Sequence, residues 1–193
     1  MDRRLGNISD MLPRRARIND LSLPYRSGSL YTLVMCTVMT AILCALAVLC
    51  SEPFVVPSVG PTIFIIFAFP LSDQAHPRNI IFSTIVAILA GAIALKAFGL
   101  VGVPPDLTDL TWLRTGALVL AVALGTAGII ALRALHVPAL ATAMIIAAGL
   151  LSKPTDWLAV FCGVVVVTYL GFAINRVAGK PQAPWWRPQP PTK

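Results

Sequence analysis

Charged side chains are scarce in this sequence. Of its 193 residues, 12% are charged and 57% are hydrophobic. A soluble domain usually has about 25% charged residues, so this composition excludes an ordinary soluble domain. We therefore expect an all-α integral membrane protein.

Motifs for catalysis and for metal binding are also lacking. The cysteines all lie in apolar runs, without C-x-x-C spacing and without a nearby histidine: Cys36, Cys44, Cys50 and Cys162. This pattern implies neither zinc nor disulfides, and we expect small buried hydrophobic side chains. No H-E-x-x-H, nucleophile elbow or Walker loop occurs, and the eight acidic residues are scattered. We therefore expect neither an enzyme, nor a cofactor, nor transport powered by ATP.

The basic residues, which give a net charge of +7, gather at the two ends of the chain. Ten flank the apolar part: Arg3, Arg4, Arg14, Arg15, Arg17, Arg26, Arg176, Lys180, Arg187 and Lys193. Charges beside membrane spans determine topology, so we expect residues 1–28 to be cytoplasmic, in a bacterial plasma membrane. Anionic lipid headgroups, and not nucleic acid, are the expected partner. Residues 179–193 form a Pro- and Trp-rich cytoplasmic tail, with Trp185 and Trp186 as interface anchors.

Six apolar segments follow one another along the chain. They comprise residues 30–50, 54–71, 80–101, 115–132, 137–151 and 157–174. A helix needs about 20 residues to cross roughly 30 Å of hydrocarbon, so the first and third segments are long enough and the fourth and sixth nearly so. The second and fifth are short or interrupted. Lys96, near the end of the third, is expected to extend its charge to the membrane surface.

An offset of 80 residues superimposes the first three segments on the last three. Thr62 then falls on Thr142 and Gly91 on Gly171. We expect two tandem repeats, residues 29–103 and 109–178, each with a broken second segment. Six crossings would make the repeats inverted, whereas four, with re-entrant broken segments, would make them parallel. Twelve of the fifteen basic residues lie inside in both cases, and we expect six crossings because the fifth segment leaves little chain for a return limb.

The second segment is broken at the stretch PSVGPT. Proline and glycine interrupt helices, so we expect no regular helix between Pro57 and Thr62, and a helix that restarts near Pro61. Gly60 would permit close approach to the backbone. Ser58 or Thr62 would offer a hydroxyl group.

The fifth segment begins with HVPALAT, which repeats this arrangement with His136, Pro138 and Thr142. Broken helices at corresponding positions of two halves indicate the substrate site of a transporter, and helix N-termini favour an anion. We therefore expect the free N–H groups of both helix starts to face a small anionic solute. The alternative is that the breaks serve packing alone, and that each threonine bonds back to its own helix.

Both broken segments resemble motifs of the HPP family of integral membrane proteins. PSVGPTIFIIFAFPLSDQAHPRN is similar to its Pro-Ser-x-Gly-x-Thr and Pro-Arg-Asn signature, and HVPALATAMIIAAGL to its His-Pro-Pro-Ala-x-Ala-Thr-Ala signature. The resemblance covers residues 30–174 and departs from the pattern at Val137, where the first proline of the family's name is missing. Some members are described as nitrite transporters, so the resemblance implies nitrite as the substrate. The matching residues are Pro57, Ser58, Gly60, Thr62, Pro77, Arg78, Asn79, His136, Pro138, Ala139, Ala141 and Thr142.

Charged residues beside the breaks admit two interpretations each. Arg133 and His136 are either cytoplasmic anchors or, respectively, a fixed charge and a titratable donor with an ordinary pKa of about 6.5. Arg78, followed by Asn79, is either a helix-end charge at the headgroups or a gate that draws the anion in.

The kind of transport stays open between a passive channel, a secondary carrier and an exporter. A scaffold or partner subunit without transport is the second class of function, and a homo-oligomer stays open as well. Solute flux through liposomes that contain only this chain would separate the two classes.

Overall fold

The computed structural model describes residues 25–106, 108 and 110–182, apart from the side chains of residues 25–27. The described part is all helical: α1 (Tyr25–Cys50), α2 (Val59–Ala68), the 3-10 helix η3 (Asp73–Ala75), α3 (Pro77–Ala97), α4 (Trp112–Ala131), α5 (Ala139–Ala147) and α6 (Pro154–Val177). The predicted all-α class is therefore confirmed for these residues. Most of the basic N-terminal segment and the tail with Trp185 and Trp186 lie outside them.

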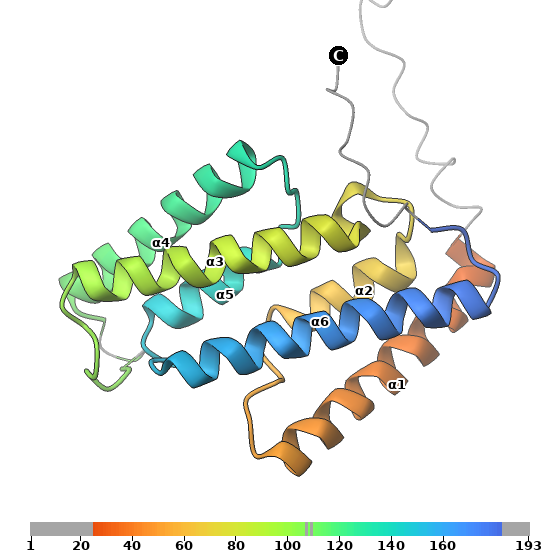
Figure 1. Cartoon of the computed structure of the whole chain (residues 1–193), viewed down its shortest axis with the longest axis horizontal. Coiled ribbons are helices and arrows are strands. Elements are labelled where there is room, and N and C mark those ends of the chain that lie inside the picture. Colours follow the sequence, from red (N-terminus) through yellow and green to blue (C-terminus); the bar gives the residue numbers. More distant parts are fainter. Residues whose placement is uncertain (1–24, 107, 109, 183–193) are drawn as a thin grey trace, which may run out of the picture.

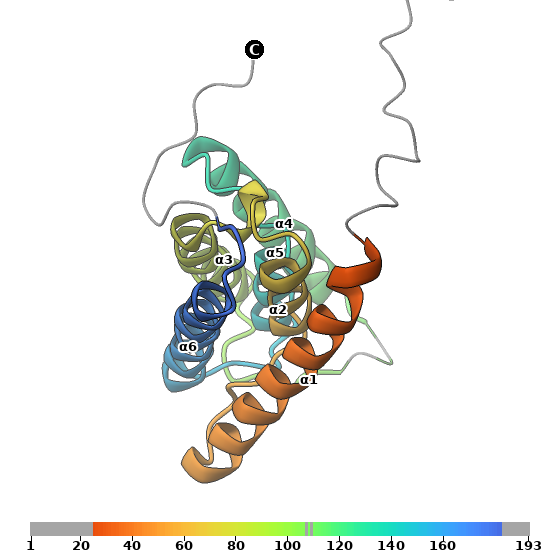
Figure 2. The same ribbon diagram turned by 90° about the vertical axis from the view of Figure 1, so that its right-hand side faces the viewer.

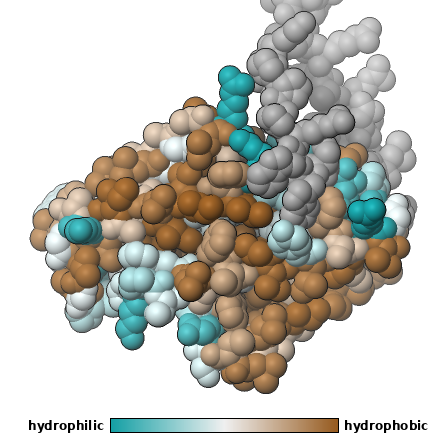
Figure 3. Space-filling model, in the orientation of Figure 1, coloured by the Kyte–Doolittle hydropathy of each residue, from teal (hydrophilic) through white to brown (hydrophobic). Residues whose placement is uncertain are grey.

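Four helices, α1, α3, α4 and α6, are long and apolar enough to cross a membrane. The other two are short, since α2 has 10 residues and α5 has 9. At a rise of 1.5 Å per residue they measure about 15 and 14 Å, which is about half of the hydrocarbon thickness. The surface over the long helices is largely hydrophobic (Figure 3). The chain is thus an integral membrane protein, and its second and fifth segments are the short ones, as predicted.

The six α-helices alternate in direction along the chain (Figure 1). In that view α1, α3 and α5 run from right to left, and α2, α4 and α6 run from left to right. Figure 2 shows the two short helices in the interior of the bundle. There α2 packs against α1 and α6, and α5 packs against α3 and α4. Each short helix is therefore held by one long helix of its own half of the chain and by one of the other half.

The start of α2 differs from our prediction. The helix begins at Val59, and Ser58 before it already has helical backbone angles, with φ −70° and ψ −22°. Gly60 and Pro61 therefore lie inside the first turn. Proline is tolerated there because a first-turn N–H has no acceptor within the helix. The expectation that no regular helix precedes Thr62 is therefore wrong.

The fifth segment is helical after Pro138, as predicted, but the helix ends at Ala147. Gly149, two residues later, has φ +82°. This left-handed conformation is typical of glycine just beyond a helix C-terminus, because a side chain would be strained there. A short helix with a defined start and end results.

Two glycines that the 80-residue offset pairs make similar contacts. A Cβ atom on Gly91 of α3 would lie 2.7 Å from the carbonyl oxygen of Ala143 and 2.8 Å from Cβ of Ile146, both in α5. A Cβ atom on Gly171 of α6 would lie 2.8 Å from Cγ2 of Ile66 in α2. Each glycine therefore lets a long helix approach the short helix of the opposite half. Packing between small residues is a usual source of helix association in membranes.

The cysteines are not the buried side chains that we predicted. They are all free thiols, and Cys36 is half-buried whereas Cys44, Cys50 and Cys162 are exposed. The outward faces of membrane helices meet lipid, which is as apolar as a protein core. An apolar sequence context therefore does not distinguish a core position from a lipid-facing one. Lys96 is exposed in the last turn of α3, which agrees with a side chain that extends to the membrane surface.

Candidate functional site

The first turns of the two short helices meet through four buried polar side chains. Ser58 Oγ and Thr142 Oγ1 share a hydrogen bond of 2.7 Å, and Thr62 Oγ1 and His136 Nε2 share one of 2.9 Å. The four side chains are at most 3% exposed. We call them the central cluster. All four were predicted as substrate-binding residues, and the structure brings them together.

The two hydrogen bonds of the central cluster are reciprocal. Thr62 in the first turn of α2 contacts His136, which lies just before α5. Thr142 in the first turn of α5 contacts Ser58, which lies just before α2. Thr62 also donates to the carbonyl oxygen of Ser58 over 2.9 Å, which is the bond back to its own helix that the alternative interpretation predicted. The two threonines are therefore linked across the halves, and one of them is also bonded locally.

Gln74 of η3 holds the histidine from a third segment. His136 Nδ1 donates to the carbonyl oxygen of Gln74 over 2.8 Å, and the side-chain oxygen of Gln74 accepts from the N–H of Val137 over 3.2 Å. A carbonyl oxygen only accepts, so the hydrogen of this pair resides on Nδ1. Gln74 thereby fixes the orientation of the ring, with Nε2 toward Thr62.

The backbone at the start of α5 does not offer the free N–H groups that we predicted. Ala139 donates to the carbonyl of His136, and the next two N–H groups donate to those of Val137 and Pro138. A tight turn directly before the helix thus satisfies them, because Pro138 has helical backbone angles.

The start of α2 has one backbone N–H group without an acceptor among the described residues. Val59 N–H is bonded to the carbonyl of Val56, and Pro61 has no N–H. Gly60 is exposed, its N–H has no acceptor among the described residues, and no atom lies within 4 Å of where its Cβ would be. Gly60 is therefore an exposed position of this turn whose backbone N–H lacks an acceptor among the described residues, and close approach of a solute to it stays a prediction.

The predicted charged residues lie apart from the central cluster. Arg78 donates to the carbonyl oxygens of Leu132 over 3.2 Å and Arg133 over 3.4 Å, and its guanidinium lies 5.3 Å from the centroid of the Phe82 ring. Arg78 thus binds the C-terminal end of α4, where the helix dipole favours a cation. It also donates to the side chain of Asn79 over 3.2 Å.

Asn79 and Arg133 also take part in the contact between η3 and the α4–α5 connection. Asn79 is buried, and its side-chain N–H donates to the carbonyl of Asp73 in η3 over 2.8 Å. Arg133 is exposed and has φ +49°, and its own N–H bonds back to the carbonyl of Ile130 as the chain leaves α4. Together with Arg78, these residues fix η3 beside the α4–α5 connection, and so hold Gln74 over the histidine.

Arg114 is a buried cation that was not among the predicted site residues. It is 4% exposed, and it donates to the carbonyl oxygens of Ala147 over 3.5 Å, Val103 over 3.4 Å and Pro104 over 3.2 Å. Its guanidinium thus binds the C-terminal end of α5, as Arg78 binds that of α4. An arginine in the first turn of an apolar helix was the signal available for it.

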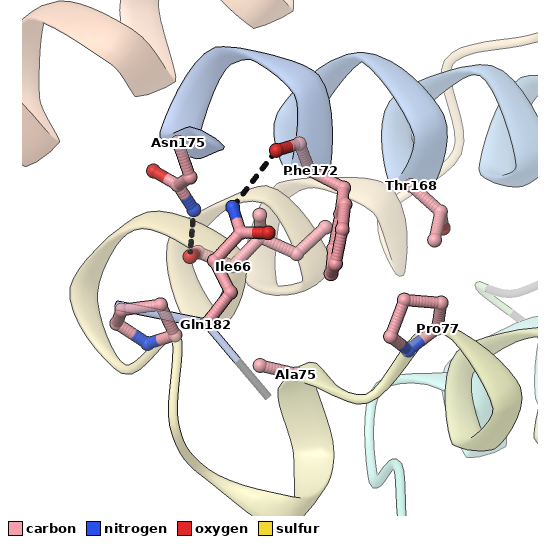
Figure 4. A pocket seen from close by; sticks show the side chains of 8 residues that line it. Ile66, Ala75, Pro77, Thr168, Phe172, Asn175 and Gln182 are labelled. Atoms are coloured by element: carbon pink, nitrogen blue, oxygen red, sulfur yellow. Dashed lines mark hydrogen bonds between the residues drawn. The ribbon is translucent and has the colours of Figure 1, made fainter. Parts of the chain in front are cut away.

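A small pocket lies one helical turn beyond the central cluster (Figure 4). It is lined by Ile66, Pro70, Ala75, Pro77, Thr168, Phe172, Asn175 and Gln182. Ile66 follows Thr62 by four residues, so both lie on one face of α2. The Asn175 amide donates to the Ile66 carbonyl over 2.9 Å, and Gln182 donates to that of Phe172 over 2.9 Å. Ile66 therefore separates the pocket from the threonine.

The sequence model described as HPP, transmembrane region, matches residues 24–184 of the chain. The matched range includes all six α-helices, η3 and the whole central cluster. No curated protein and no solved structure matches the chain.

Proposed function

The chain belongs to the HPP family of integral membrane proteins, and we propose from that premise that it transports a small inorganic anion, nitrite, across the membrane. The observation that carries the proposal is the meeting of the two short helices at their N-terminal turns. Broken helices that meet in this way in transporters present the positive ends of their dipoles to an anionic group. The central cluster would form the polar part of such a site.

Each predicted residue has a role in this proposal. The hydroxyls of Ser58, Thr62 and Thr142 and the ring of His136 supply hydrogen-bond donors to the anion. Gly60 leaves the backbone N–H open, and Pro138 fixes the turn that aims α5 at the site.

The remaining residues act at one end of the bundle. Arg78, Asn79 and Arg133 hold η3 against the α4–α5 connection, where a movement would uncover His136. The alternation of helix directions supports two inverted repeats, which is the arrangement that lets one site face each side of the membrane in turn.

Flux of nitrite into liposomes that contain only this chain tests the proposal. Uptake should exceed that of protein-free liposomes, should saturate with nitrite concentration, and should fall in the double variant Thr62→Val, Thr142→Val. Uptake equal to that of protein-free liposomes, from correctly folded protein, would contradict transport by this chain alone.

A scaffold or partner subunit without transport is the second candidate. It is favoured by one observation, which is that the side chains of the central cluster are hydrogen-bonded to one another and to Gln74. Such a network also serves packing between the two halves. In that case the variants would lower thermal stability, and no nitrite flux would be measured for any of them.

A further inference from the structure

The central cluster holds no fixed charge, which matters for an anion that enters it. Its hydroxyl groups are neutral, and the two arginines that bind helix ends, Arg78 and Arg114, are engaged with the carbonyls of α4 and α5. An anion at membrane depth is strongly unfavourable without a compensating charge. The compensating positive charge therefore has to enter together with the anion, or it has to be carried by a side chain that can acquire a charge.

His136 is the member of the central cluster that can become positively charged. Its Nδ1 already carries a hydrogen, because the Gln74 carbonyl oxygen 2.8 Å away can only accept. On the other side of the ring, Thr62 Oγ1 lies 2.9 Å from Nε2 and 2.9 Å from the carbonyl oxygen of Ser58. The threonine has a single hydroxyl hydrogen for these two contacts.

The neutral and the protonated ring satisfy the two contacts differently. When the ring is neutral, Nε2 and the Ser58 carbonyl oxygen are both acceptors, so one of the contacts lacks a hydrogen. When Nε2 is protonated, it donates to Thr62 Oγ1, and the hydroxyl donates to the carbonyl oxygen. Both contacts then have a hydrogen, so the arrangement provides a place for a proton on Nε2.

The pair of Ser58 and Thr142 provides a hydrogen-bond donor in the same cluster as the proton site on Nε2. Two hydroxyl hydrogens serve one hydrogen bond of 2.7 Å between these side chains. One hydrogen is left over, and the described residues give it no second acceptor. A donor to an anion and a proton-accepting nitrogen thus lie in one buried cluster.

We propose, as an extension of the proposed transport, that each anion crosses together with one proton, which His136 holds on Nε2 while the Ser58 and Thr142 pair donates to the anion. The proton comes from the solution on the side where the anion enters, and it leaves to the solution on the other side. The histidine returns to its starting state, and the net charge moved is zero. Charging the buried ring alone is unfavourable and a bound anion offsets this, so proton and anion bind cooperatively.

Other ionisable groups lie on the segments beside His136. They are Asp73 in η3, His76 between η3 and α3, Arg78 on α3, and Arg133 after α4. The short helices α2 and α5 contain no ionisable side chain. Arginine stays protonated throughout the range in which histidine titrates. The aspartate and the second histidine are therefore the groups that an experiment has to distinguish from His136.

The test measures charge and protons during nitrite uptake into liposomes with the parent protein and an enclosed pH-sensitive dye. Potassium and valinomycin set the membrane potential. We expect uptake to acidify the interior by about one proton per nitrite, above the leak of protein-free liposomes, and to be insensitive to the imposed potential. We expect His136→Gln to lose this acidification, whereas His76→Gln and Asp73→Asn should behave like the parent.

Each outcome has a distinct meaning. Nitrite flux that follows the imposed potential without acidification would overturn the coupling and leave the proposed transport standing. A parent without any flux above protein-free liposomes would contradict the proposed transport itself. Because the charge measurement uses the parent protein, it decides whether a proton accompanies the anion even where His136→Gln does not fold. Acidification that persists in folded His136→Gln and is lost in His76→Gln would move the proton site to the other histidine and so overturn the assignment.

Discussion

Ser58 Oγ and Thr142 Oγ1 lie 2.7 Å apart, although 84 positions separate the two residues in the chain. Both are buried, and both belong to the N-terminal turn of a short helix or to the residue before it. Their contact is one of the two hydrogen bonds between side chains of the central cluster, the other being that of Thr62 with His136. Each bond uses the hydroxyl of one threonine, so the two bonds can be removed one at a time and compared.

Replacing either threonine by valine should weaken nitrite binding while the fold is retained. Thr62→Val and Thr142→Val keep the side-chain shape and remove a hydroxyl that contributes about 0.5 to 1.5 kcal/mol, equivalent to roughly two- to tenfold in affinity. Nitrite binding and uptake by the purified variants measure the effect. Thr168→Val is the matched control, since Thr168 is equally buried and bonds only to the carbonyl of Val164 in its own helix. If both cluster variants transport like the parent, these threonines are packing residues.

Arg78 should matter for stability through its geometry as well as its charge. Its guanidinium reaches the carbonyls of Leu132 and Arg133 together, which a lysine ammonium cannot imitate. We expect Arg78→Ala to cost about 1 to 2 kcal/mol and Arg78→Lys to recover only part of this. Thermal unfolding in detergent measures the loss, with Lys96→Ala at the exposed end of α3 as the control. Full recovery by lysine in both stability and uptake would show that a simple charge suffices.

Replacement by alanine should affect stability at Gly91 and nitrite uptake at Gly60. A Cβ atom at Gly60 meets no atom within 4 Å, whereas one at Gly91 would lie 2.7 Å from the Ala143 carbonyl oxygen. Gly91→Ala should therefore lower the free energy of unfolding by about 1 to 3 kcal/mol, and the unfolding temperature should fall with it. Gly60→Ala should leave that temperature unchanged and lower nitrite uptake, because the added methyl group occupies space beside the backbone N–H. Unchanged uptake by Gly60→Ala would remove this N–H from the proposed site.

Arg114 should be among the most important residues for stability. Its guanidinium is 4% exposed and binds three carbonyl oxygens at the end of α5 and in the α3–α4 connection. Arg114→Ala leaves the buried carbonyl of Ala147 and the carbonyls of the exposed residues Val103 and Pro104 without this donor, at a cost of about 1 to 3 kcal/mol. The unfolding temperature and the yield of folded protein in detergent measure the loss. A variant as stable as the parent would show that water replaces the arginine at these carbonyls.

The sequence was sufficient to predict the two broken segments and their meeting. Pro57 and Pro138 lie just before α2 and α5, and the 80-residue offset places the starts of the two short helices at corresponding positions. Residue type then indicated which side chains carry hydrogen-bonding groups. The position of the helix start at Val59 was not predictable, because proline ends a helix in its interior but is compatible with its first turn.

The contacts of Gln74 and Arg78 were beyond a reading of the sequence. Gln74 lies in a short loop without helical or strand periodicity, and its acceptor role depends on a histidine 62 positions away. Arg78 was interpreted either as a helix-end charge at the headgroups or as a gate, and the contact with the end of α4, which is not its own helix, was not predicted. Side chains that connect loops of different halves follow from the packing of those halves, for which a single sequence contains no direct signal.

The long sequence separation within the central cluster has a consequence for biogenesis. Ser58 and Thr62 are synthesised more than 70 residues before His136 and Thr142, the side chains that satisfy them. While the second half is still being made, the Ser58 hydroxyl has no partner among the described residues of the first half, so the start of α2 must keep contact with water or with the insertion machinery. We therefore expect stable integration of α2 to follow the arrival of α5, and α6, the last of the described helices, then to pack against α2.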